Sequence, residues 1–90
     1  MSNRVIKFGA SWCQPCVSMA PAFKKFQEAH TNSKVIIQDV DVDEEYQMAS
    51  EFAVKTIPYT IFIKDGQVVE KVSGTANFDK LSQIYEKHFH

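Results

Sequence analysis

Cys13 and Cys16 carry the strongest chemical signal of this sequence, because they are its two cysteines and only two residues separate them. A structural disulfide between them would close a very short loop and would constrain the unfolded chain little. A structural zinc site needs four ligands, usually two such pairs or one pair with two spaced histidines, and the three histidines of the chain lack that spacing. Thiol–disulfide redox chemistry is therefore the leading interpretation, ahead of a cysteine pair without a function.

The segment from Trp12 to Cys16 lies between an expected strand and an expected helix, with Pro15 in the first turn, where a helix tolerates proline. At a helix N-terminus the unpaired backbone N–H groups and the helix dipole would stabilise a thiolate on Cys13, which makes it the better nucleophile. Residues three apart lie on the same side of a helix, so Cys16 can reach Cys13. The expected cycle has Cys13 attack a substrate disulfide and Cys16 resolve the mixed disulfide.

The elements that must position this motif can be located from apolar spacing and turn signals, among which Asp65-Gly66 predicts a hairpin. We expect strands at 5–8, 35–42, 60–63 and 67–72, a turn at 30–33, and helices at 14–29, 43–53 and 78–89, the last capped by Asn77. Two crossover helices imply parallel neighbours, and the hairpin adds antiparallel strands. The order βαβαββα thus predicts an α/β fold with a mixed four-stranded sheet covered by three helices.

Length and composition restrict the class of protein. Ninety residues suit a single domain that spans 1–90. Ten Lys and Arg against 11 Asp and Glu give a net charge of -1, which leaves no basic excess for nucleic acid. No apolar run approaches the ~18–20 residues of a membrane helix, and the N-terminus does not resemble a signal peptide. We therefore expect a cytoplasmic monomer that binds neither nucleic acid nor membranes.

Five motifs, in the same order, resemble the thioredoxin family over nearly the whole chain. Trp12 to Cys16 resembles the Trp-Cys-Gly-Pro-Cys centre of that family, with Gln14 in place of glycine. The other matches are Pro21 at the kink of the active-site helix, Ile57-Pro58 at the cis-proline, Asp65-Gly66 at the late hairpin and Gly74 before the last helix. The resemblance implies a thioredoxin fold and the activity of a protein-disulfide reductase.

The resemblance also implies a substrate-docking surface around the cysteines. Pro58 would be cis, face the cysteines and help to hold an incoming peptide by strand-like pairing. The residues alone leave both forms of the Ile57–Pro58 bond open and favour trans. The expected docking residues are Trp12, Ala10, Gln14, Pro15, Ile57 and Gly74.

The chain departs from the family pattern at three places. Thioredoxins usually begin with an extra strand and helix, which have no counterpart before the first expected strand, so we expect one less covered sheet edge. Gln14 changes the dipeptide between the cysteines, which tunes the reduction potential. The family usually carries a buried aspartate on the strand before the motif and a lysine on the neighbouring strand, and here Lys7 and Asp39 hold these positions with the signs exchanged.

We expect Lys7 and Asp39 to form an inverted ion pair beneath Cys16, because a lone buried ammonium is costly whereas a paired one can stay charged. Asp39, with or without a water molecule, would then assist proton transfer at Cys16. The alternative is that Lys7 extends to solvent over a thinly covered sheet. For Asp39, Asp41 and Asp43 together, strand-end and helix-capping roles explain the series better than a cation site.

The leading functional hypothesis is a reductase of protein disulfides that needs no bound cofactor, since the dithiol carries both electrons. By resemblance, its electrons would come from a flavin-dependent thioredoxin reductase that uses NADPH, and ribonucleotide reductase is a candidate recipient. One alternative is an interaction module whose surface around Trp12 and Pro58 binds a protein irrespective of redox state. The other is a glutaredoxin-like user of glutathione, which Trp12 and Gln14-Pro15 disfavour.

Overall fold

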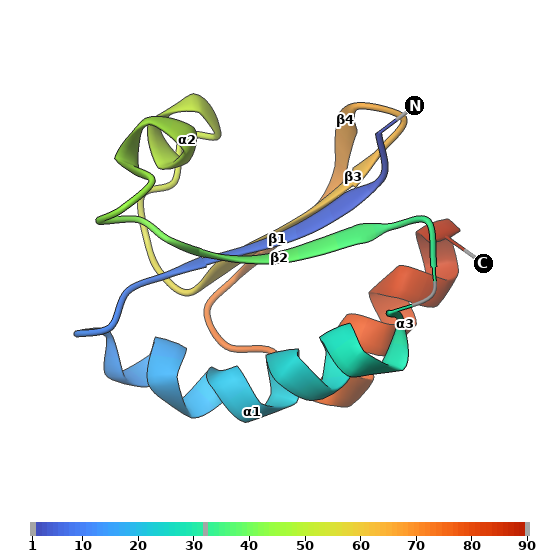
Figure 1. Ribbon diagram of the computed structural model, residues 1–90, viewed down its shortest axis with the longest axis horizontal. Coiled ribbons are helices and arrows are strands. Elements are labelled where there is room, and N and C mark those ends of the chain that lie inside the picture. The colour runs from blue at the N-terminus through green and yellow to red at the C-terminus, as the bar shows by residue number, and fades with distance from the viewer. Residues whose placement is uncertain (1, 32, 90) are drawn as a thin grey trace.

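The computed structural model describes residues 2–31 and 33–89, so Asn32 of the expected turn and His90 lie outside the described residues. Within them the chain follows the order βαβαββα that the sequence predicts (Figure 1). The strands are β1 (Arg4–Gly9), β2 (Ile36–Asp41), β3 (Tyr59–Lys64) and β4 (Gln67–Ser73). The helices are α1 (Gln14–Ala29), α2 (Tyr46–Glu51) and α3 (Phe78–Phe89). Among the described residues, no helix has both the length and the apolar character to cross a membrane.

The four strands form one mixed sheet in the order β2-β1-β3-β4. Strands β1 and β2 are parallel and are joined by α1, whereas β1 with β3 and β3 with β4 are antiparallel. The expectation that both helical connections join parallel strands is therefore wrong for the second. Strand β2 ends and β3 begins at the same end of the sheet, because Gly9 pairs with Asp41 and Phe8 pairs with Tyr59. Strand β3 therefore runs in the direction opposite to β2.

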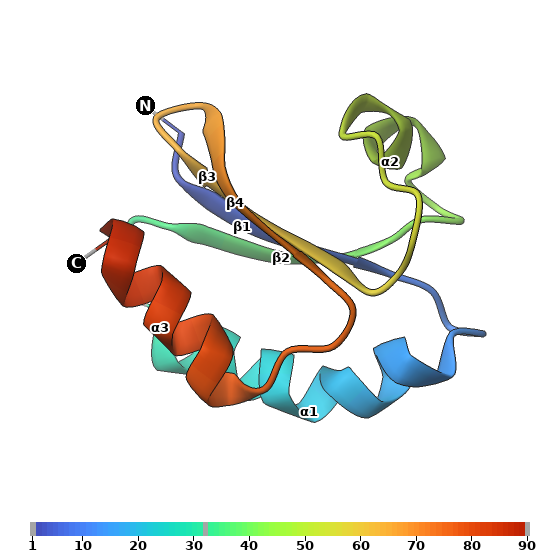
Figure 2. The same cartoon turned by 180° about the vertical axis from the view of Figure 1, so that it is seen from behind.

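The helices cover the two faces of the sheet unequally (Figures 1 and 2). Helices α1 and α3 lie together against one face, and the short α2 lies against the other. The core on the α1 and α3 side includes Phe23, Phe26 and Phe62, all fully buried. The second core gathers Ile6, Phe8, Val40, Ala49, Ile61 and Ile63 under α2. On β2, an edge strand, Ile36 is 58% exposed.

The ends of the elements follow local signals closely, with one exception. Cys13 is the N-cap of α1, and Asn77 caps α3 through its side-chain oxygen, which accepts a hydrogen bond from the Lys80 N–H at 2.8 Å. Asp65 and Gly66 both have positive φ, which the hairpin turn requires. The exception is α2, which ends at Glu51 rather than at 53, because the chain enters the left-handed region at Ala53.

Candidate active site

The loops that carry the cysteine motif and the Ile57–Pro58 segment lie at the same end of the strands. Strand β1 ends there opposite the end of β2, and β3 begins there opposite the end of β4, since Tyr59 pairs with Ser73. The chain that follows β1 leads directly into α1 through the motif. The topology therefore explains why segments from four parts of the chain meet at one place.

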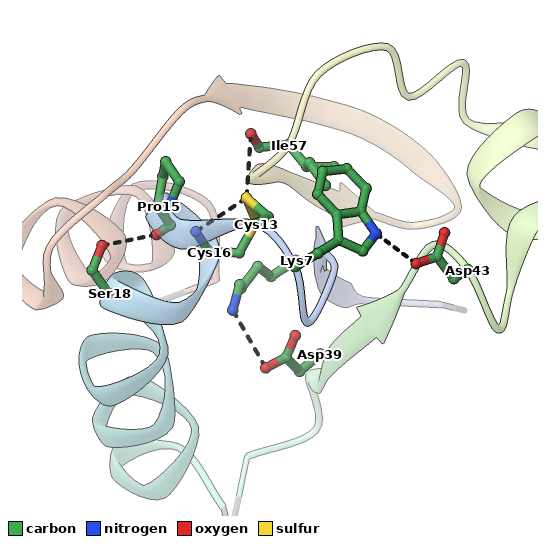
Figure 3. The surroundings of a disulfide bond; sticks show 9 residues. Lys7, Cys13, Pro15, Cys16, Ser18, Asp39, Asp43 and Ile57 are labelled. Atoms are coloured by element: carbon green, nitrogen blue, oxygen red, sulfur yellow. Dashed lines mark hydrogen bonds and ion pairs between the residues drawn. A yellow bond between two sulfur atoms is a disulfide. The ribbon is translucent and has the colours of Figure 1, made fainter.

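Cys13 and Cys16 form a disulfide at the N-terminus of α1 (Figure 3). Their Cα atoms are 5.2 Å apart, and the Cys16 N–H donates to Cys13 Sγ at 3.2 Å. Both side chains are almost fully buried, with 6% of Cys13 and 3% of Cys16 exposed. The sulfur at the N-cap position accepts a backbone N–H, which is the environment that stabilises a thiolate at a helix N-terminus.

The Ile57–Pro58 loop lies against Cys13. Its peptide bond is cis, as the resemblance implies, so the trans form that the spacing alone favoured is wrong. The Ile57 carbonyl oxygen is 3.9 Å from Cys13 Sγ, and Pro58 itself is buried. Gly74, which has a positive φ, donates its N–H to the Pro58 carbonyl at 2.9 Å and so brings the loop after β4 to the same place.

Trp12 stands at the surface beside the disulfide with 69% of its area exposed. Its indole Nε1–H donates to the carboxylate of Asp43 at 2.7 Å, which fixes the ring against the segment after β2. A shallow pocket of about 200 Å³ adjoins it and is lined by Trp12, Val42, Ala49, Val54, Lys55, Thr56 and Ile57. Of the other expected docking residues, Ala10 is buried, whereas Gln14 and Pro15 are exposed at the start of α1.

Lys7 and Asp39 face each other across β1 and β2, which pair in register at these residues. The Lys7 Nζ lies 3.5 Å from Asp39 Oδ2 and 5.6 Å from the centre of the Phe23 ring. Lys7 is 3% exposed, so the alternative in which it extends to solvent is wrong. Asp39 is less covered than expected for a buried pair, because 47% of its side chain remains exposed.

A second pocket, of about 340 Å³, adjoins Cys16. Its lining includes Cys16, the Lys7–Asp39 pair, Asp41, Gly9, Ala10, Ser11, Val17 and Ala20. Gly9 lets α1 approach the strand closely here, because a Cβ on Gly9 would stand 3.3 Å from both Cβ and Sγ of Cys16. The resolving cysteine and the ion pair therefore share one open cavity.

Sequence reasoning missed two residues of this site. Asp43 was assigned to the start of a helix, but α2 begins after it at Tyr46, and its carboxylate instead holds Trp12. The second residue is Gly9, which directly follows the strand expected at 5–8. A glycine four residues before a cysteine at a strand–helix junction is the signal that would have suggested a close backbone approach.

Comparisons with known proteins agree with this geometry. The family model described as Thioredoxin matches residues 1–87. Thioredoxin H5 of Arabidopsis thaliana is 39% identical over 84 residues, which cover 93% of this chain and 69% of that protein. A thioredoxin of Malassezia sympodialis is 38% identical over 84 residues, covering 93% of this chain and 79% of its own. The X-ray structure of Fasciola hepatica thioredoxin superposes with a TM-score of 0.83 at 34% identity, covering 97% of this chain and 81% of that one.

Proposed function

This chain belongs to the thioredoxin family and is a thiol–disulfide oxidoreductase, and from that premise we propose that it works as a reductase of protein disulfides. The family implies disulfide-containing protein substrates and a reductase as electron donor. The observation that carries the proposal is the disulfide between Cys13 and Cys16 at the start of α1, next to the exposed Trp12 and the Ile57–Pro58 loop. Nothing in the structure or the comparisons favours a redox-independent module or a glutathione-dependent reductase.

In the proposed cycle, Cys13 is the attacking residue. Its thiolate displaces one sulfur of the substrate disulfide, which leaves as a thiolate and takes up a proton, and a mixed disulfide forms. The position of Cys13 supports this role, because its sulfur caps the helix and lies nearest the Ile57 carbonyl on the docking side. Cys16 then attacks the Cys13 sulfur, the second substrate sulfur leaves, and two electrons have passed from the dithiol to the substrate.

The docking surface in this proposal is formed by Trp12, Ala10, Gln14, Pro15, Ile57 and Gly74 together with the Pro58 loop. An extended substrate segment would lie along 57–58 and pair with its backbone, as the family resemblance implies. The shallow apolar pocket between Trp12 and Ile57 supports this placement, because it offers a site for one substrate side chain next to Cys13.

Asp39 is proposed as a supporting residue of the resolving step. Its half-exposed carboxylate lines the same pocket as Cys16 and can accept the Cys16 proton, with or without a water molecule, and pass it to solvent. If Asp39→Asn changed neither the Cys16 titration nor the rate of resolution, this role would be excluded.

The proposal extends to partners and location. We propose a flavin-dependent, NADPH-using thioredoxin reductase as electron donor and ribonucleotide reductase as one recipient, with the protein acting as a cytoplasmic monomer. Because the dithiol carries both electrons, the cycle needs no bound cofactor. These assignments depend on the family resemblance and on the absence of a strong charge bias in the sequence.

The experiment that tests the function compares the two single cysteine variants. Cys16→Ser should accumulate a mixed disulfide between Cys13 and its target, seen on non-reducing gels, because the resolving thiol is gone. Cys13→Ser is the matched control and should trap much less. Reduction of a disulfide-containing protein such as insulin should be lost in both variants and in the double variant. Equal trapping by the two variants, or full activity of the double variant, would contradict the proposed cycle.

A further inference from the structure

The buried ammonium of Lys7 is poorly compensated in the oxidised protein. Its partner, Asp39, is half exposed and 3.5 Å away, and the face of Phe23 is 5.6 Å from the nitrogen. An ammonium has three donors, and removing one from water is costly unless anions or strong acceptors replace the water. Lys7 therefore occupies a position that a second anion would stabilise.

Cys16 lies close enough to provide that anion. The point where a Gly9 Cβ would stand is 3.3 Å from Cys16 Sγ and 3.6 Å from Lys7 Cε, so both side chains pack against the same bare glycine. Figure 3 shows the Lys7 side chain running past the disulfide toward Asp39. The sulfur and the lysine also line the same pocket, which is open to solvent.

Three charged side chains line this pocket, and their burial determines which of them has the largest electrostatic effect on Cys16. Strand β1 contributes Lys7, strand β2 contributes Asp39 and Asp41, and α1 contributes the uncharged Val17 and Ala20 beside Cys16 itself. Asp39 is half exposed, and Asp41 is partly exposed and accepts the Asp43 N–H at 2.8 Å. Water screens these two carboxylates, whereas Lys7 acts through the low-dielectric interior.

The same charges make an external anion an unsuitable occupant. A ligand anion would have to pass two carboxylates at the lining of the pocket before it met the ammonium. A thiolate on Cys16 needs no such passage, because it forms inside the cavity when its bond to Cys13 is broken.

We propose that Lys7 is a positioning residue for the resolving step, which its ammonium promotes by stabilising Cys16 as a thiolate while the substrate is bound to Cys13. The inference rests on the proposed function. In this step the Cys16 thiol gives its proton to solvent or Asp39, and the thiolate attacks Cys13 Sγ. The Cys13–Cys16 bond then forms as the Cys13–substrate bond breaks, and the departing substrate thiolate takes up a proton. The exchange of charges relative to the family pattern thus places a cation, not an acid, beneath the resolving sulfur.

The test is the titration of Cys16 in a Cys13→Ser background, followed by the ultraviolet absorbance of the thiolate as the pH is raised. Adding Lys7→Met should move the midpoint upward by about one pH unit or more, because the opposite charge of the buried ammonium that packs beside Cys16 is lost. Lys7→Arg, which keeps the charge, should move it by less than half as much. Lys24→Met, which removes an exposed lysine from α1, is the matched control and should leave it in place.

The result that overturns the proposal is a midpoint that Lys7→Met moves no further than Lys24→Met does. If Lys7→Met does not fold, as judged by circular dichroism, Lys7→Gln replaces it and is held to the same criterion. In the wild-type background, Lys7→Met should slow resolution of a preformed mixed disulfide at neutral pH and have little effect at high pH, where Cys16 ionises without help. The titration uses no substrate, so it tests the role of Lys7 separately from the proposed function. An inactive wild-type protein would refute the reductase proposal, and the shift of the Cys16 midpoint would still decide the role of Lys7.

Discussion

At the residue scale, the absence of a side chain at Gly9 determines how closely α1 can approach β1. Cys16 is tethered by its disulfide and by the helix, so it cannot move far to make room for a larger neighbour. A methyl group on Gly9 would meet Cys16 Cβ and Sγ at 3.3 Å, which is tighter than ordinary van der Waals contact. Gly9 is therefore important at this position because its lack of a side chain leaves room for Cys16.

We predict that Gly9→Ala destabilises the oxidised protein by about 1 kcal/mol. Overpacking a rigid site costs about 1–3 kcal/mol, and the lower entropy of the unfolded alanine chain offsets about 0.4–1 kcal/mol of that. Urea unfolding of the oxidised protein measures the difference, with Ser11→Ala at the exposed neighbouring loop as control. An unchanged or raised stability would show that Cys16 relaxes away from the new methyl group.

At the element scale, α3 depends on a cap as well as on its apolar face. The Asn77 side-chain oxygen accepts the Lys80 N–H, and the Leu81 N–H donates to the Asn77 carbonyl at 3.1 Å as the first turn closes. Leu81 is fully buried in the core shared with α1. The cap thus helps to hold the first turn that carries this core residue.

Asn77→Ala should lower the free energy of unfolding by about 1 kcal/mol, because an N-cap oxygen is lost and the Lys80 N–H is left to solvent. Asn77→Asp is the matched variant and should retain most of the stability, since aspartate caps helices as well as asparagine does. Thermal unfolding followed by circular dichroism distinguishes the two. A loss in the aspartate variant equal to that in the alanine variant would contradict a capping role.

At the scale of the whole molecule, a polar cluster joins the edge strand β4 to the end of α3. Glu70 lies 3.0 Å from His88 Nε2 and 3.8 Å from Lys87 Nζ. The hydrogen bond from His88, helped by the charges of Lys87, His88 and Lys80, lowers the pKa of Glu70 below its ordinary value of 4.5, although partial burial opposes the shift. A lowered pKa in the folded state stabilises the protein above the unfolded value, and this contribution disappears as the pH falls through the folded pKa.

Glu70→Gln should therefore reduce stability at neutral pH by a modest amount, and the difference from wild type should shrink as the pH falls below 4.5. Melting temperatures measured from neutral to acidic pH test this. Glu28→Gln, which removes an exposed carboxylate from α1, serves as the control. A difference that stays constant over the whole range would mean that the ionised form of Glu70 contributes nothing specific.

Most of the fold and the centre of the site could be predicted, because the patterns that indicate them are formed by residues close together in the sequence. The Cys13/Cys16 spacing, the Asn77 cap and the Asp65-Gly66 turn each depend on a few adjacent residues. The extent of α2 was less predictable, since six residues without a side-chain cap carry a weak signal. Its end is decided by the backbone at Ala53 and by packing on the sheet.

The sequence by itself determined the redox motif and the order of the elements, because spacing and family pattern define these. For Lys7 and Asp39 it left both an ion pair and a lysine that extends to solvent open. Only the tertiary structure decided the reversed direction of β3, the bond between Trp12 and Asp43, and the unequal burial of the Lys7–Asp39 pair. These features join residues more than 30 positions apart, 31 for the indole bond and 32 for the ion pair. Burial at such contacts depends on how α1 and β2 close over β1, which no short stretch of sequence encodes.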